Sequence, residues 1–103
     1  MQNKDIEIIG KIIEYIDDIA EYINNMSSHD FLQYKKTITA CAFSVTQIGE
    51  LVKNISDEVQ NKYNNIPRKA IRGMRNIDLI VLWSTIKKNL PSLKSELEKS
   101  LFG

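Results

Sequence analysis

Hydrophobic and polar residues follow a helical rhythm along almost the whole chain. In the first stretch, apolar residues recur every three or four positions, at Ile6, Ile9, Ile13, Ile16, Ala20 and Ile23. This spacing places them on one side of a helix, so the pattern predicts a helix over about Lys4–Asn25, with Asp17, Asp18 and Glu21 facing water. Ser27, Ser28 and Asp30 follow, and their side-chain oxygens can cap the start of the next helix.

A second stripe predicts one long helix that ends near Ile55. Its apolar positions again step by three and four, at Phe31, Tyr34, Ile38, Cys41, Val45, Ile48, Val52 and Ile55. Gly49 lies inside this pattern, where glycine costs about 1 kcal/mol relative to alanine. A glycine at such a position suggests a close approach of another helix, although a glycine that is merely tolerated there would give the same sequence.

The remaining pattern predicts shorter helices and a final long one. Ser56 can cap a helix over about Asp57–Tyr63, and Pro67 suits the first turn of another. Asp78 can cap the last helix, which Pro91 should kink or divide. The apolar side of this helix consists of Leu82, Ile86, Leu90, Leu93, Leu97 and Leu101. No stretch alternates with period two, so we expect an all-α bundle of four to six helices, two of them long and antiparallel, forming one domain over residues 1–103.

Composition agrees with a folded protein and excludes several kinds of site. The 103 residues are 43% hydrophobic and 26% charged, which is typical of a globular domain. No secretory leader and no apolar run of about 18 residues is present, so we expect a cytoplasmic protein without a membrane span.

One histidine and one cysteine cannot form the usual zinc sets, and no cofactor motif is found. Cys41 lies in an apolar stripe, which favours packing, and His29 in a Ser-Ser-His-Asp linker favours a solvated or capping role.

Charge is unevenly distributed. Residues 1–30 hold two lysines and seven acidic residues, whereas residues 31–77 hold eight basic and three acidic ones. All five charged residues within 59–77 are positive, namely Lys62, Arg68, Lys69, Arg72 and Arg75. Arg68, Arg72 and Arg75 share one helical face by their spacing, and guanidinium groups bind phosphate through paired hydrogen bonds. An ion-paired structural face against the acidic first helix is the alternative, and charge alone favours it.

The segment from Ile66-Pro67 to Gly73-Met74-Arg75-Asn76 resembles the signature helix of the HepT-like HEPN ribonuclease toxins. The resemblance continues in Thr46-Gln47-Ile48-Gly49-Glu50-Leu51 and in Ile77-Asp78-Leu79, and it extends to the Leu90-Pro91 region. It therefore covers nearly the whole chain in the same order.

This resemblance implies metal-independent RNA cleavage in a site shared by two protomers. A histidine would serve as general acid and base at the ribose 2′-hydroxyl, and an arginine would hold the scissile phosphate. Carried over to this sequence, Arg75 is the motif arginine, Asn76 is its polar neighbour and Glu50 helps to organise the site, while Arg68, Lys69 and Arg72 would contact RNA. The implied partners are a second copy of the chain and a minimal nucleotidyltransferase antitoxin, which adenylylates the motif tyrosine.

The sequence departs from this family where the histidine should stand. The family continues from the Arg-Asn pair into several residues and a His-x-Tyr motif, but here Asn76 is followed at once by Ile77-Asp78-Leu79. Either the polypeptide is shortened, or residues between Asn76 and Ile77 are omitted from the sequence as written. The shortened connection could form a tight turn, or a fused helix that forces domain swapping.

Three functions follow from these observations. The first is a toxin of a toxin–antitoxin pair, of endoribonuclease descent but inactive in this short form. The second is a non-catalytic HEPN-like module for dimerisation and partner binding. The third is a structural bundle whose arginine face serves a protein partner.

Overall fold

The computed structural model of the chain describes residues 3–57 and 78–102. All regular secondary structure in these two ranges is helical, which confirms the predicted all-α class. The helices are α1 (Asn3–Tyr22), α2 (Ser28–Gln33), α3 (Lys35–Lys53), α6 (Leu79–Ser84), the π-helix η2 (Thr85–Asn89) and α7 (Leu90–Phe102). Among the helices of these ranges, none has both the length and the hydropathy needed to cross a bilayer.

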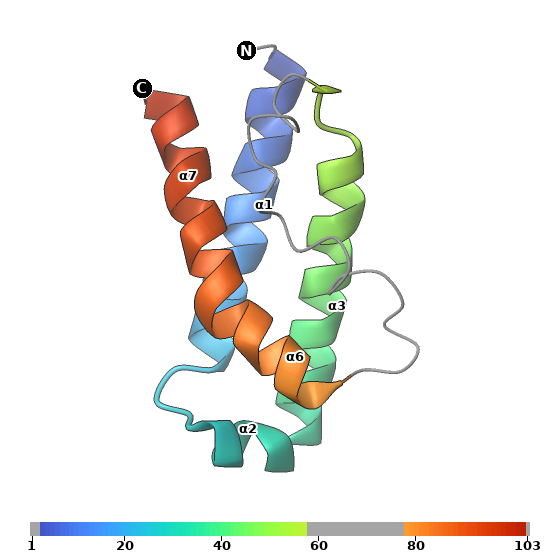
Figure 1. The fold of residues 1–103 in the computed structure, drawn as a ribbon. Helices are drawn as coiled ribbons and strands as arrows, with labels where there is room; N and C mark the ends of the chain where they lie inside the picture. The colour runs from blue at the N-terminus through green and yellow to red at the C-terminus, as the bar shows by residue number, and fades with distance from the viewer. Residues whose placement is uncertain (1–2, 58–77, 103) are drawn as a thin grey trace.

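The two long helices α1 and α3 lie side by side and run in opposite directions (Figure 1), as the sequence predicted. The continuous rod formed by α6, η2 and α7 packs across this pair, and α7 contacts α1. The short helix α2 crosses one end of the bundle, where it contacts both α3 and α6. The core lies between these elements and is built mainly from isoleucine, leucine and valine.

The buried face of α1 differs from the predicted stripe. Ile9, Ile16 and Ile23 are buried as expected, but Ile6 and Ala20 are exposed. Ile8, Ile12 and Ile19, which the stripe left out, are buried in their place. Helix α1 contains so many isoleucines that several different faces of the helix show apolar residues at a spacing of three and four. Packing against α3 and α7 selects the set centred on Ile12.

The predicted single helix from Phe31 to Ile55 is wrong, because Tyr34 interrupts it. Tyr34 adopts an extended conformation, with φ −102° and ψ 91°, between α2 and α3. Its side chain is 57% exposed, although the pattern placed it on the buried stripe. The chain turns here because α2 must cross the end of the bundle to bury Phe31, whose ring lies 4.9 Å from the ring of Trp83 on α6.

The predicted caps at the starts of α2 and α6 are confirmed. Ser27 and Asp30 form a reciprocal capping box at the start of α2, with both hydrogen bonds at 3.1 Å. The Asp78 carboxylate accepts hydrogen bonds from the amides of Ile80 and Val81 at the start of α6. Pro91 is the second residue of α7, and the last helix widens into the π-helix η2 in the turn before it without being interrupted. Proline lacks an N–H and crowds the carbonyl four residues earlier, and the wider turn of η2 accommodates both effects.

Candidate functional site

Most of the predicted site residues lie outside the described residues. These are Arg68, Lys69, Arg72, Arg75 and Asn76, all within residues 58–77. The predicted helices over Asp57–Tyr63 and after Pro67 fall there too, apart from Asp57 itself. What the structure does describe is Glu50 and the two residues, Ser56 and Asp78, that flank this basic part of the chain.

Glu50 lies near the C-terminal end of α3, with 62% of its side chain exposed. Its carboxylate accepts a hydrogen bond from Lys53 Nζ at 3.1 Å, and its backbone carbonyl accepts one from the Asn54 side-chain amide. An exposed ion pair of this kind stabilises a fold by less than about 1 kcal/mol. The carboxylate is thus held loosely at the surface, six residues before Ser56, where it can be approached by a ligand or by another chain.

Ser56 is fixed by a buried carboxylate from the far end of the chain. Asp5 in the first turn of α1 is only 2% exposed, and its two oxygens accept hydrogen bonds from the Ser56 amide and the Ser56 hydroxyl, both at 2.9 Å. Sequence analysis missed this contact, which joins residues 51 positions apart. The sequence contained one clue to this contact. Asp5 lies three and four residues before the buried Ile8 and Ile9, so an acidic residue occupies a position on the buried face of α1.

The other flank of the basic segment is fixed by the α6 cap. Asp78 caps α6 through two amides, and the half-buried Leu79 beside it packs against the core. The fold therefore anchors the chain immediately before and after the stretch that carries Arg72 and Arg75.

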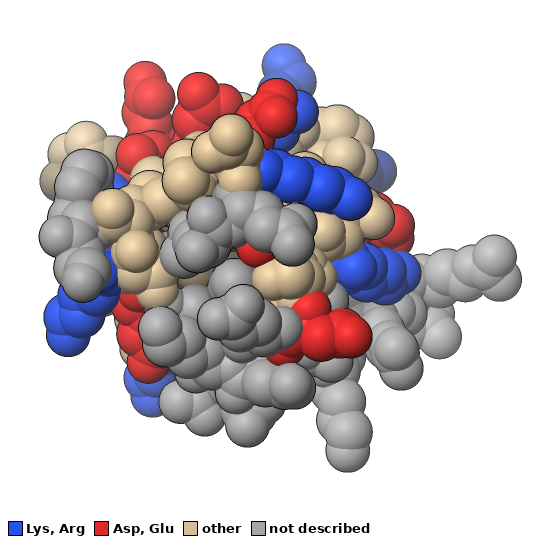
Figure 2. Space-filling view, turned by 90° about the horizontal axis from the view of Figure 1, so that it is seen from above, with Lys and Arg blue, Asp and Glu red and all other residues tan. Residues whose placement is uncertain are grey.

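One acidic residue on the surface of α1 forms an ion pair with α7. Lys94 Nζ donates a hydrogen bond to Asp17 at 2.6 Å, and this bond raises the pKa of the Lys94 ammonium. Figure 2 shows one end of the molecule, where acidic and basic side chains of the described residues are interspersed rather than gathered by sign. Asp17 therefore has a basic partner, Lys94, within the described residues.

The lone cysteine and the lone histidine have the roles expected of them. Cys41 is fully buried on α3, and burial raises the pKa of its thiol to about 11. It therefore packs as an apolar residue and does not form the reactive thiolate at neutral pH. His29 on α2 is exposed, and its Nε2 lies 2.7 Å from Gln33 Nε2. The described residues hold no cluster of three His, Cys, Asp or Glu side chains suited to a metal ion.

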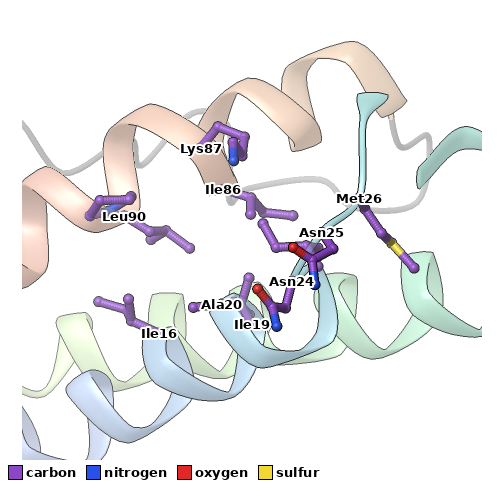
Figure 3. Close-up of a pocket in the computed structure, with 11 residues that line it drawn as sticks. Ile16, Ile19, Ala20, Asn24, Asn25, Met26, Ile86, Lys87 and Leu90 are labelled. Carbon is purple, nitrogen blue, oxygen red and sulfur yellow. The ribbon is translucent and has the colours of Figure 1, made fainter. Parts of the chain in front are cut away.

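A pocket of about 330 Å³ lies at the other end of α1 from Asp5 (Figure 3). Ile16, Ile19, Ile86 and Leu90 form its floor, and Asn24, Asn25 and Lys87 stand at its edge. The floor residues expose 4% of their surface or less, so a ligand would find little apolar area. Asn25 has a left-handed backbone, with φ 63°, which asparagine tolerates in turns. We assign no function to this pocket.

Comparison with known proteins identifies relatives over most of the chain. Residues 12–100 match the family model described as Ribonuclease HepT-like. A protein of Methanocaldococcus jannaschii named as a putative RNase is 34% identical over 83 residues, which cover 73% of this chain and 69% of that protein. A probable ribonuclease HepT of Thermococcus cleftensis is 37% identical over 78 residues, covering 68% of this chain and 71% of the relative. No solved structure gives a significant match.

Proposed function

This chain belongs to the HepT-like ribonuclease family, and from that membership we propose that it is the toxin-side protein of a toxin–antitoxin pair that binds RNA but has lost the ability to cleave it. In this proposal it acts in the cytoplasm as a homodimer. Arg75 grips an RNA phosphate at the junction of the two protomers, with Asn76 and Glu50 beside it, and Arg68, Lys69 and Arg72 extend the contact along the RNA backbone.

The family match over residues 12–100 carries this proposal, because it includes both the basic segment and Glu50. Guanidinium groups suit a phosphate ligand because they offer paired donors and stay charged at any physiological pH. The exposed position of Glu50, close in sequence to the anchored Ser56, supports a role at the edge of such a site.

We attribute the loss of cleavage to the absence of the histidine that the family resemblance implies after the Arg-Asn pair. Attack by the 2′-hydroxyl requires a base within hydrogen-bonding reach, and the one histidine of the chain is His29 on α2. Glu50 lies fifteen residues along α3 from its first residue Lys35, which at 1.5 Å per residue is roughly 22 Å. His29 precedes that first residue, so it cannot serve a site beside Glu50 of the same protomer.

The sequence continues from Asn76 directly into Ile77, with no His-x-Tyr motif between them. Without the motif tyrosine, a minimal nucleotidyltransferase has no target at that place. We therefore expect no adenylylation when the chain is incubated with labelled ATP and such an enzyme, and labelling of a tyrosine would contradict this part of the proposal.

RNA binding can be tested through its dependence on salt. Each phosphate contact contributes roughly one unit to the slope of log affinity against log salt concentration. We expect Arg72→Ala and Arg75→Ala each to weaken transfer RNA binding and to lower that slope by about one unit. Lys88→Ala, which removes an exposed cation of η2, is the matched control and should leave the slope unchanged.

The missing histidine also favours a second candidate, the non-catalytic module for dimerisation and partner binding. In that case both arginine variants would leave RNA affinity and its salt slope unaltered. Binding of the antitoxin would then be the only activity to survive.

A further inference from the structure

Within the rod of α6, η2 and α7 (Figure 1), one wide turn sets the orientation of α6. In η2 the amide of Leu90 donates its hydrogen bond to the carbonyl of Thr85, five residues earlier, whereas an α-helix joins residues four apart. The extra residue turns everything before it by about 100° relative to a continuous α-helix. Pro91 favours the wide turn, because its ring crowds the carbonyl four residues before it. A residue of α7 therefore determines which side of α6 faces the core.

The wide turn brings a threonine into the core and leaves a tryptophan at its margin. Thr85 exposes 3% of its surface, and its hydroxyl donates a hydrogen bond to the Val81 carbonyl at 2.8 Å. Leu82 is buried beside it. Trp83, the one tryptophan of the chain, is only partly buried.

The sequence of the rod also fits a continuous α-helix. Without the extra residue, each position of α6 moves to the place of the residue before it, so Trp83 takes the buried place of Leu82. Thr85 in turn takes the half-buried place of Ser84. The apolar residues then step by four and three in strict alternation, at Leu79, Trp83, Ile86, Leu90, Leu93 and Leu97, which is the spacing of a single buried face.

Neither orientation buries a charge, because residues 79–83 are all apolar. We infer that α6 has two registers, the π register of the structure and an α register turned by about 100°, and that Pro91 holds it in the first. Close packing of the core admits these two registers and no orientation between them. The turn separates Trp83 from Phe31, whose ring centroids lie 4.9 Å apart, and buries the larger indole in exchange.

The register also sets the direction in which the chain enters α6. Asp78 caps this helix through the amides of Ile80 and Val81, so it turns with the helix. It directly follows the basic segment in the sequence. RNA held by that segment is therefore coupled to the register, and by reciprocity the two affect each other by the same factor. This coupling rests on the RNA binding of the proposed function, whereas the two registers do not.

Trp83 reports the register directly. With fluorotryptophan incorporated, the chain carries one fluorine label, whose NMR signal depends on the surroundings of the indole. Pro91→Ala removes the crowding and should raise the population of the α register by at least roughly tenfold. A new signal should appear that responds less to heavy water, because the indole is more deeply buried. Ser92→Ala, which changes the exposed neighbour of Pro91, should keep the original signal.

An unchanged fluorine signal in Pro91→Ala, with the original response to heavy water, would overturn the inference. Thr85→Lys provides an independent test, since a lysine is buried at this position in the π register, which disfavours its charge, and reaches water in the α register. We expect a folded chain, checked by circular dichroism, with the same new signal as Pro91→Ala. Thr85→Val is the matched control and should keep the original signal. If Thr85→Lys unfolds while Thr85→Val stays folded, α6 has no second register.

Addition of transfer RNA to Pro91→Ala separates this inference from the proposed function. RNA that binds and changes the ratio of the two signals supports the coupling. RNA that binds and leaves the ratio unchanged overturns the coupling, while the registers stand on the two substitutions. RNA that does not bind the original chain overturns the proposed function and the coupling together, and the registers are still decided by Pro91→Ala and Thr85→Lys.

Discussion

Among single residues, Asp5 holds Ser56 near the end of the first described range. Its buried carboxylate accepts two hydrogen bonds from Ser56, so removal of the carboxylate leaves a partly buried amide and hydroxyl without that acceptor. Such a loss costs about 1–3 kcal/mol. We expect Asp5→Ala to lower the free energy of unfolding by this amount, measured by urea denaturation.

Glu21→Ala is the control for that substitution, because Glu21 is an exposed acidic residue of the same helix. It should change the stability by less than about 0.5 kcal/mol. If both variants were equally stable, the contact between Asp5 and Ser56 would not anchor the segment.

Cys41 gives a second prediction at this scale. Its thiol has a pKa of about 11 in the folded chain, raised by burial from the ordinary value of 9.0. Between these two values the unfolded chain loses the thiol proton while the folded chain keeps it, so stability falls as the pH rises through this window. Cys41→Ala should show a shallower decline in unfolding free energy over the same window. An identical decline in both proteins would mean that the thiol is accessible to water in the fold.

At the scale of the elements, helix α2 depends on its capping box. Replacement of an N-cap serine by alanine costs about 0.5–2 kcal/mol, so Ser27→Ala should destabilise the chain by that amount in urea denaturation. Ser28→Ala, one residue further along, removes no described cap bond and should have a smaller effect.

The same cap predicts a pH dependence. Hydrogen bonds from the amide and hydroxyl of Ser27 hold the pKa of Asp30 below its usual value of 3.8. The carboxylate therefore stabilises the fold above pH 3.8, and this contribution is lost as the pH falls through the lowered pKa of the folded chain. In Ser27→Ala the acid-induced loss should be smaller, which a urea titration at several acidic pH values would detect.

Helix existence and helix caps could be predicted from the sequence, but two features of the packing could not. Ser27, Asp78 and Pro91 act locally, through groups within a few residues, and local chemistry is visible in sequence. The break at Tyr34 depends on a distant partner, because α2 turns to place Phe31 against Trp83. The buried face of α1 likewise depends on which neighbours pack against a helix rich in isoleucine.

For the whole molecule, the resemblance predicted the family and directed attention to Glu50 and the basic segment. It could not predict the contact between Asp5 and Ser56, because a pairing across 51 residues leaves only a faint trace, an acidic residue in an apolar stripe. The assignments of Arg68, Lys69, Arg72, Arg75 and Asn76 stay predictions.

The central claim is that this member of a ribonuclease family holds RNA without cutting it. The most direct test incubates the purified chain, confirmed by mass spectrometry at 11.9 kDa, with labelled transfer RNA under conditions where binding is saturated. A variant with a family His-x-Tyr stretch inserted between Asn76 and Ile77 serves as the positive comparison. We expect the original chain to leave the RNA intact while the insertion variant cleaves it; robust cleavage by the original chain would contradict the account.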